Sequence, residues 1–308
     1  MGGSGKTTLA KYIYISNRHN FESSCFLEEI GKHSKETYGL LGIQKQLLAD
    51  ILGAGKDKMI FCVAEGTTKI SEALHRKKML IVLDEHDELD ALLGISAVHT
   101  QSKIIITTRL LDIHSWFESI SWRCRVHELK LLNNQESLEV FSWHAFGSKL
   151  PLEGFSDLAV ELTRYCGGNP LALKVLGSSL FVSVEDPRER SNIIEIWRSR
   201  LNSLSSMKGD LDCKIQGVVQ KSFDSLPHVS YKELFLHIVV FFVGEDEDYV
   251  VDILEQDLHA KVGIMTLINR CLRSVSPDKK LVIHQLLQDM GRNIVREESK
   301  DPAKHTRI

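Results

Sequence analysis

The chain has 308 residues, of which 43% are hydrophobic and 26% are charged, values typical of a globular protein with two or three domains rather than of a disordered or fibrous one. Its net charge of -3 gives no general positive field for nucleic acid or anionic lipid, and its longest apolar run, Phe235 to Val243, is about half the ~20 residues of a membrane helix and therefore predicts a buried helix. The six cysteines form no CxxC pair and the N-terminus carries no secretion signal, which favours reduced thiols and a protein of the cytosol or the nucleus.

The first third of the chain alternates helical patterns with short apolar runs. Three of these runs predict buried strands, at Cys25-Leu27, Met79-Leu83 and Lys103-Thr107. Leucine and isoleucine recur at helical spacing over residues 40–52 and predict a crossover helix. A fourth strand is predicted at Arg125-Leu129. This order predicts an α/β domain with a parallel sheet.

After residue 130 the patterns are those of amphipathic helices. Asn133 and Glu136, three residues apart, predict a capping box for a helix that runs to about Phe146. Further helices are predicted at 155–166, 170–181, 191–203, 213–223, 230–242 and 260–273. Prolines in the polar gaps between helices place domain boundaries near residues 148 and 226, which gives domains 1–148, 149–226 and 227–308.

The N-terminal segment Gly2-Gly3-Ser4-Gly5-Lys6-Thr7-Thr8 matches the second part of the phosphate-binding motif G-x-x-x-x-G-K-[ST]. Glycines allow backbone N–H groups to converge on phosphate oxygens, and the helix that follows adds its positive end. Lys6 is predicted to pair with the β- and γ-phosphates, the Thr7 hydroxyl to ligate Mg²⁺ and Thr8 to lie near the α-phosphate. The alternative, a flexible Gly/Ser start, is disfavoured because the other half of the site follows downstream.

That other half is a strand that ends in a carboxylate, Asp84, which is predicted to hold Mg²⁺ directly or through water. Glu85 follows at once and is a candidate general base for an attacking water, with a solvated or helix-start carboxylate as the alternative. Arg109 follows the third predicted strand, and its guanidinium is a candidate contact for the γ-phosphate, with a surface ion pair as the alternative.

The first glycine of the phosphate motif would precede Met1, and so would the strand that delivers the loop. Because that strand is central in a P-loop fold, we expect a fragment of a longer protein or a shortened gene product.

Several segments, taken in order, resemble the NB-ARC domain of plant disease-resistance receptors: Gly2 to Ala10, Phe21 to Leu27, Lys77 to Asp87 and Ile104 to Arg109. Two later segments are similar to later motifs of the same family: Phe141 to Phe146, and Cys166 to Leu173, which matches its "GLPL" segment. The resemblance covers essentially the whole chain. Within the family, the Phe-Glu-x-Ser-Cys-Phe-Leu segment and Asp87 resemble receptors that carry an N-terminal TIR domain.

The resemblance implies a P-loop α/β domain, a helical bundle and a winged-helix domain, in agreement with the boundaries drawn from composition. It implies a switch in which ADP holds an off state and ATP favours an open, self-associating state. The TIR domain and leucine-rich repeats of such receptors are not in this chain and are implied as its partners; nucleic acid and membrane are not.

The resemblance also assigns roles to residues of the later segments. Pro170 and Leu171 would line the adenine, a role compatible with a helix-start proline and a core leucine. The family's Met-His-Asp signature falls at Ile283-His284-Gln285, where His284 would donate to the β-phosphate of ADP. Gln285 replaces a carboxylate, so it cannot supply the negative charge that favours a protonated histidine.

Three rival interpretations remain. A metabolic or motor ATPase would turn over fast, whereas we expect slow hydrolysis at most, because no assured catalytic base is identified and Glu85-His86 departs from the family pattern. A DNA-reading winged helix is disfavoured by 11 Lys/Arg against 13 Asp/Glu in residues 227–308, including the acidic run Glu245-Asp248. The third interpretation is a nonfunctional remnant of a receptor.

Overall fold

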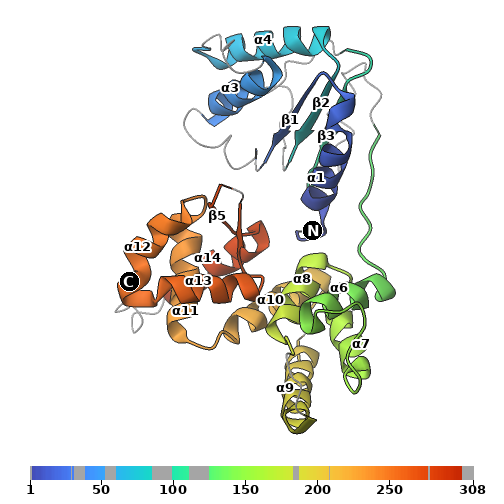
Figure 1. The fold of residues 1–308 in the computed structure, drawn as a ribbon, viewed down its shortest axis with the longest axis vertical. Helices are drawn as coiled ribbons and strands as arrows, with labels where there is room; N and C mark the ends of the chain where they lie inside the picture. The colour runs from blue at the N-terminus through green and yellow to red at the C-terminus, as the bar shows by residue number, and fades with distance from the viewer. Residues whose placement is uncertain are drawn as a thin grey trace. The chain divides into compact units, whose positions relative to one another are not determined.

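The computed structural model describes residues 2–28, 30, 39–52, 60–84, 99–110, 125–182, 187–207, 209–276 and 278–299. The chain divides into two compact units (Figure 1). The first, the α/β unit, is Gly5–Leu129; the second, the helical unit, consists of Met1–Ser4 together with Lys130–Ile308. No helix in the described part of the chain is both long and apolar enough to cross a membrane.

A three-stranded parallel sheet forms the centre of the α/β unit. Its strands lie in the order β1 (Ser23–Leu27), β2 (Met79–Leu83) and β3 (Lys103–Ile106). Every residue of β2 is buried, as expected of a continuous apolar run in the middle strand of a parallel sheet. The three strands predicted from these runs are confirmed, and the third ends one residue earlier than predicted.

Helices cover this sheet. They are α1 (Lys6–Asn17), which a short 3-10 turn, η1 (Arg18–Asn20), extends, α3 (Gly39–Leu52) and α4 (Val63–Arg76). Helix α3 confirms the predicted crossover helix, and it packs against both α4 and β1 (Figure 1). The shared core contains apolar side chains of all three elements and of β2, among them Cys25, Leu47, Ile51, Ile70, Leu74 and Ile81.

The prediction of a fourth strand at Arg125–Leu129 is wrong. These residues have no strand assignment, and 125–128 are exposed to solvent. The two apolar residues, Val126 and Leu129, are three positions apart, so an extended backbone places them on opposite faces and cannot bury both against one sheet. Val126 is accordingly 46% exposed.

A bundle of five helices begins the helical unit: α6 (Asn134–Phe146), α7 (Ser156–Tyr165), α8 (Pro170–Ser179), α9 (Pro187–Ser205) and α10 (Leu211–Asp224). All five were predicted, and their ends differ from the prediction by a few residues. Their buried side chains form one core, in which the Trp197 ring contacts the buried rings of Phe141 and Phe155 and the partly buried ring of Phe146.

The capping box predicted at the start of α6 is confirmed. The Asn133 side chain accepts a hydrogen bond from the backbone N–H of Glu136, and the Glu136 side chain accepts one from the backbone N–H of Asn133, both at 2.9 Å. The two bonds satisfy donors that a helix start otherwise leaves without partners.

The domain boundaries predicted near residues 148 and 226 remain predictions.

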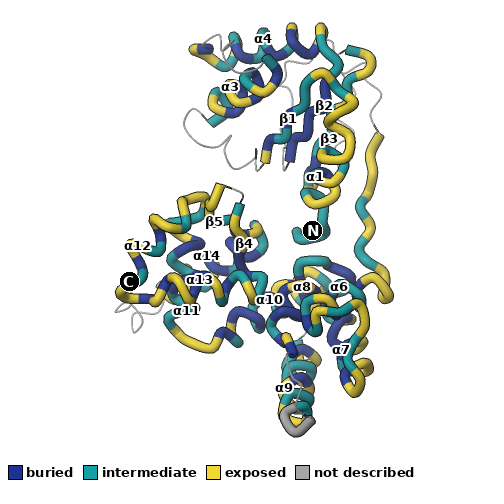
Figure 2. Tube along the Cα trace, in the orientation of Figure 1, coloured by how far each residue is buried: buried dark blue, intermediate teal, exposed yellow. Residues whose placement is uncertain are grey.

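The last part of the helical unit contains helices and a short hairpin: α11 (Val229–His237), a π-helical turn η3 (Ile238–Phe242), α12 (Glu247–Leu258), α13 (Ala260–Asn269), the antiparallel strands β4 (Ser274–Val275) and β5 (Leu281–Val282), and α14 (Gln285–Ser299). Helices α12 and α14 were not predicted. The predicted buried helix at Phe235–Val243 is helical to Phe242 but is buried on one face only, because Phe241 is 62% exposed. Buried and exposed positions alternate along the helices of this part (Figure 2).

Free thiols occur at each of the five cysteines in the described part of the chain. Burial raises the pKa of the Cys166 thiol, and burial with an S–H hydrogen bond to Asp50 raises the pKa of Cys25. Both thiols are therefore protonated at neutral pH.

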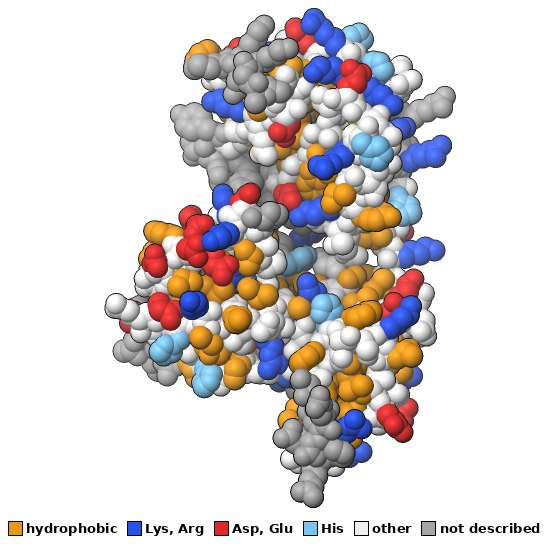
Figure 3. Space-filling view, in the orientation of Figure 1, with side chains coloured by type: hydrophobic (Ala, Val, Ile, Leu, Met, Phe, Trp, Pro, Cys, Tyr) orange, Lys and Arg blue, Asp and Glu red, His pale blue; other side chains and the backbone are white. Residues whose placement is uncertain are grey.

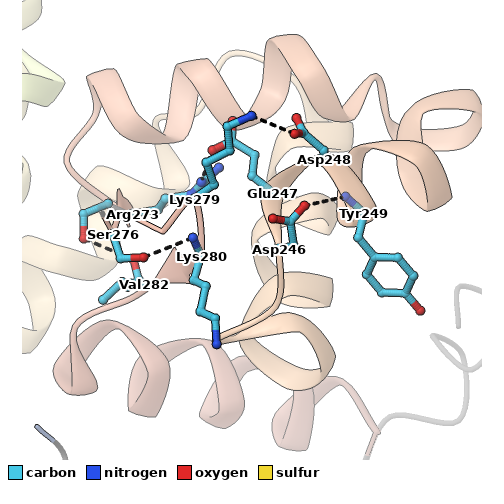
Figure 4. Close-up of polar contacts among 10 residues, drawn as sticks. Asp246, Glu247, Asp248, Tyr249, Arg273, Ser276, Lys279, Lys280 and Val282 are labelled. Carbon is cyan, nitrogen blue, oxygen red and sulfur yellow. Dashed lines mark hydrogen bonds and ion pairs between the residues drawn. The ribbon is translucent and has the colours of Figure 1, made fainter. Parts of the chain in front are cut away.

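Acidic side chains of the run Glu245–Asp248 gather beside β5 and the start of α12 (Figure 3). Figure 4 shows two ion pairs of this run, both at 2.9 Å. Lys279 pairs with Asp248 in solvent, whereas the Arg273 side chain is fully buried and donates to the partly buried Glu247. Within the described residues the other buried nitrogens of Arg273, Nε and Nη1, have no hydrogen-bond partner.

Because Glu247 is the carboxylate partner of a buried guanidinium, Glu247→Ala is expected to destabilise the helical unit by about 2 kcal/mol. Asp248→Ala removes the partner of a solvated lysine and serves as the matched control, with an expected change below about 0.5 kcal/mol. Urea unfolding of the two variants measures both values. Equal losses of unfolding free energy in the two variants would show that the burial of Arg273 does not determine the effect of Glu247→Ala.

Candidate functional site

The predicted phosphate motif Gly2–Thr8 contains the start of α1, because the helix begins at Lys6 rather than after the motif. Gly5 occupies the N-cap in the left-handed conformation, with φ of 93°, and Gly3 is also left-handed, with φ of 74°. Residues with side chains rarely adopt this conformation, so the loop requires glycine at both positions. Gly5 brings no capping side chain and the first turn of α1 contains no acidic residue, which suits the approach of an anion to this helix end.

Thr7 of the first turn of α1 reaches the end of β2 inside the α/β unit. Its hydroxyl donates to the Asp84 carboxylate, with both carboxylate oxygens at 2.9 Å from Oγ1. Asp84 is 3% exposed and also accepts from the Thr107 hydroxyl at 2.5 Å. The sequence had placed Thr7 and Asp84 in one metal site, and the structure brings these two side chains together.

Thr107 was not predicted as a site residue. It follows β3, and parallel strands end at the same edge of a sheet, so its hydroxyl lies beside the carboxylate that follows β2. The sequence signal that could have identified Thr107 is a polar residue at the end of the strand that pairs with β2, the strand that Asp84 follows. These hydroxyl and carboxylate oxygens are the hard ligands that Mg²⁺ prefers. The described residues contain no group of three or more His, Cys, Asp or Glu placed to hold a metal ion.

Three further site residues were predicted in the α/β unit, Thr8, Arg109 and Glu85. Thr8 is exposed on α1, and Arg109 is exposed in the bend that follows β3. Glu85, the candidate general base, lies outside the described residues, as does Asp87.

Within the helical unit, the start of the phosphate loop contacts the start of α8. The backbone N–H of Leu171 donates to the Gly3 carbonyl at 3.3 Å. The Asn169 side chain caps α8 by accepting from the Ala172 N–H at 3.1 Å, and its amide nitrogen donates to the Gly2 carbonyl at 2.8 Å. Pro170 is the first residue of α8 and is half-buried, as is Leu171. Asn169 was missed as a site residue, although an asparagine before a helix-start proline is a recognisable N-cap.

His284 immediately precedes α14 and is exposed. Its ring Nδ1 accepts from the backbone N–H of Leu286 at 3.1 Å, so a neutral ring carries its proton on Nε2. Gln285 turns to its own helix, where its side-chain amide donates to Asp289 at 2.9 Å. Gln285, which replaces the carboxylate of the family signature, therefore bonds to the Asp289 carboxylate one helical turn later.

Two family models match the chain. Residues 1–151 match the model of the NB-ARC domain. Residues 228–299 match the model of the winged-helix domain of Roq1-like disease resistance proteins. The chain carries an NB-ARC domain followed by a winged-helix domain of the disease-resistance type. The resemblance and the predicted fold class, a P-loop α/β domain followed by helices and a winged-helix domain, are confirmed.

Relatives of this NB-ARC chain include the disease resistance protein RUN1 of Vitis rotundifolia, which is 36% identical over 318 residues, and the TMV resistance protein N of Nicotiana glutinosa, which is 34% identical over 321 residues. Both alignments cover 100% of the chain but only 22% and 26% of the relatives, so the NB-ARC chain spans about a quarter of their length.

Among solved structures, the NB-ARC chain is similar to a STAND (signal transduction ATPase with numerous domains) protein with a tetratricopeptide repeat sensor, PH0952 of Pyrococcus horikoshii. The TM-score is 0.56 at 16% identity, and the match covers 99% of the NB-ARC chain and 43% of that protein. At this identity the likeness concerns the fold.

Proposed function

We propose that this NB-ARC chain is the adenine-nucleotide switch segment of a plant immune receptor, with ADP in the off state and ATP in the on state. The observation that carries the proposal is the left-handed glycine loop that opens α1, whose Thr7 contacts the buried Asp84. The backbone N–H groups of a loop of this kind donate to phosphate oxygens, and a buried carboxylate needs a cation or hydroxyl partner. Both features fit a nucleotide with its metal.

In this proposal each group of the chain has one task. The loop from Gly2 to Gly5 and the amino group of Lys6 bind the phosphates, while Thr7 and Asp84 hold Mg²⁺. Mg²⁺, when bound, neutralises part of the phosphate charge. Arg109 contacts the γ-phosphate and so distinguishes ATP from ADP.

The helical unit contributes the groups that would bind adenine and sense the β-phosphate. Pro170 and Leu171 pack on the base, and the Nε2–H of His284 donates to the β-phosphate of ADP. The Nδ1 contact with Leu286 supports this role, because it fixes the tautomer that has a donor at Nε2. Gln285, which follows His284 in the sequence, donates its side-chain amide to Asp289 instead.

The output of the switch is occupancy rather than chemistry, so any hydrolysis is slow. We propose the cytosol or the nucleus as the compartment, the TIR and leucine-rich-repeat domains of a full receptor as partners, and self-association as the response to ATP. A general P-loop ATPase is the second candidate. A steady-state phosphate-release assay separates the two, since turnover of roughly 1–100 s⁻¹ would be that of an ordinary phosphoryl-transfer enzyme.

The test of the proposal is to purify the chain, denature it, and identify and quantify the nucleotide that is released. About one equivalent of ADP per chain is expected. A folded chain that releases no nucleotide and takes up neither ADP nor ATP would exclude a switch segment and leave an interaction scaffold.

Asp84→Asn is expected to reduce the gain in ATP affinity that Mg²⁺ provides by about tenfold, because the amide keeps the shape of the side chain but removes the charge that attracts the cation. Titrations of ATP with and without Mg²⁺ measure this gain. Asp50→Asn, which changes another carboxylate of the α/β unit, is the control and should leave the gain unchanged. An equal Mg²⁺ effect in wild type and Asp84→Asn would remove Asp84 from the metal site.

A further inference from the structure

Asn169 connects the start of α8 with the start of the phosphate loop, and both belong to the helical unit. Its side chain is fully buried, and both ends of its amide have partners. The oxygen accepts from Ala172 N–H, which caps the helix, and the nitrogen donates to the carbonyl of Gly2. An amide is suited to this place because it supplies one acceptor and one donor at the same time.

The two contacts fix the orientation of two successive peptide planes. Asn169 holds the Gly2 carbonyl, and the Leu171 N–H holds the Gly3 carbonyl, so both oxygens point toward the start of α8. The described chain contains no cis peptide bonds, and in a trans peptide the N–H of the next residue points opposite to the carbonyl. The N–H groups of Gly3 and Ser4 therefore point away from α8.

The loop and the helix start also fit closely. A Cβ added to Gly3 would lie 2.8 Å from both the Asn169 Oδ1 atom and the Leu171 Cβ atom, closer than a Cβ atom approaches other atoms. Gly3 is left-handed in addition, with φ of 74°. The position of these peptide planes thus depends on glycine in the loop and on asparagine at the helix cap.

We propose that Asn169 is a positioning residue of the nucleotide site, which turns the N–H groups of Gly3 and Ser4 toward the phosphates of the bound nucleotide. The inference rests on the proposed function and adds to it a residue that recognises no part of the nucleotide itself. Asn169 acts on the phosphates through the loop. Its replacement should therefore lower the affinity for ligands that carry phosphates and leave recognition of the base intact.

Asn169→Ser tests this role without introducing a charge. Serine is a good N-cap, so α8 keeps its cap, but the single short hydroxyl cannot also donate to the Gly2 carbonyl. Asn133→Ser is the matched control, because Asn133 caps α6 through the same kind of bond and does not touch the phosphate loop. Binding of ADP and of adenosine, which lacks phosphates, is measured by calorimetry on the full chain, together with the thermal midpoint without ligand.

We expect Asn169→Ser to weaken ADP binding about tenfold, the equivalent of roughly 1.4 kcal/mol, with adenosine binding within about twofold of wild type and the thermal midpoint close to that of Asn133→Ser. Wild-type affinity for ADP in Asn169→Ser would overturn the positioning role and leave the proposed function standing. Equal losses of ADP and adenosine would also overturn it, since they indicate a general structural role. A wild-type chain that binds no ADP would overturn both proposals.

Discussion

Replacing Lys6 with methionine is expected to lower the affinity for ADP about 100-fold, or roughly 2.7 kcal/mol. Lys6 is the first residue of α1, directly after the left-handed Gly5, so its amino group is the side-chain positive charge closest in sequence to the glycines of the phosphate loop. Methionine keeps most of the length of the side chain but cannot donate a hydrogen bond or carry a charge. The loss should therefore be one of ligand binding and not of folding.

Lys11→Met is the matched control for this prediction. Lys11 lies on the same helix, and its replacement by methionine removes the same charge. Its amino group, however, pairs with Glu28 at 2.8 Å, and both side chains are about half exposed. Calorimetric titration with ADP and a thermal unfolding curve are needed for both variants. Similar affinities in Lys6→Met and Lys11→Met would contradict a phosphate-binding role for Lys6, because general electrostatics would then account for any change.

Trp197→Ala is expected to destabilise the helical unit by about 3–5 kcal/mol, the largest stability effect anticipated for this chain. The Trp197 side chain is 1% exposed, and its ring centroid lies 5.0 Å from that of Phe155, 5.3 Å from that of Phe146 and 5.6 Å from that of Phe141. Two of these rings belong to α6 and the third to the residue that precedes α7, so removal of the indole leaves a cavity between packed elements that cannot close it without moving together.

Trp143→Ala removes the same side chain from a position that is 54% exposed, and it is expected to change the free energy of unfolding by less than about 1 kcal/mol. Urea unfolding followed by far-ultraviolet circular dichroism measures both variants. A loss below about 1 kcal/mol in Trp197→Ala would mean that the bundle collapses into the space, and that the contacts of the Trp197 ring do not set its stability.

The sequence alone determined the elements whose signals lie within a short window. Five consecutive apolar residues identified β2, and the pair Asn133 and Glu136 identified the start of α6, because each pattern is complete within one strand or one helical turn. The glycines, lysine and threonine of the phosphate loop were read in the same way. The strand predicted at Arg125–Leu129 failed because its apolar residues do not share a face.

Helices α12 and α14 show the limit of this approach. Helix α12 begins in an acidic run that is typical of a solvated segment, yet Val250, Leu254 and Leu258, four residues apart, are buried on one side of it. The acidic residues occupy its first turn, where the helix dipole favours them. The charge run hid an amphipathic pattern that is as regular as those of the predicted helices.

The motifs predicted that Thr7 and Asp84 meet, but only the tertiary structure decided the contacts of Thr107 and Asn169. Thr107 was not connected with Asp84 in the sequence, although the two lie side by side once β2 and β3 pair in parallel. Asn169 bonds to Gly2 across 167 positions, a separation at which no periodicity can be read. Composition and spacing specify the local backbone, whereas contacts between distant residues depend on how the elements pack, and the orientation of the phosphate loop in this chain is a contact of that second kind.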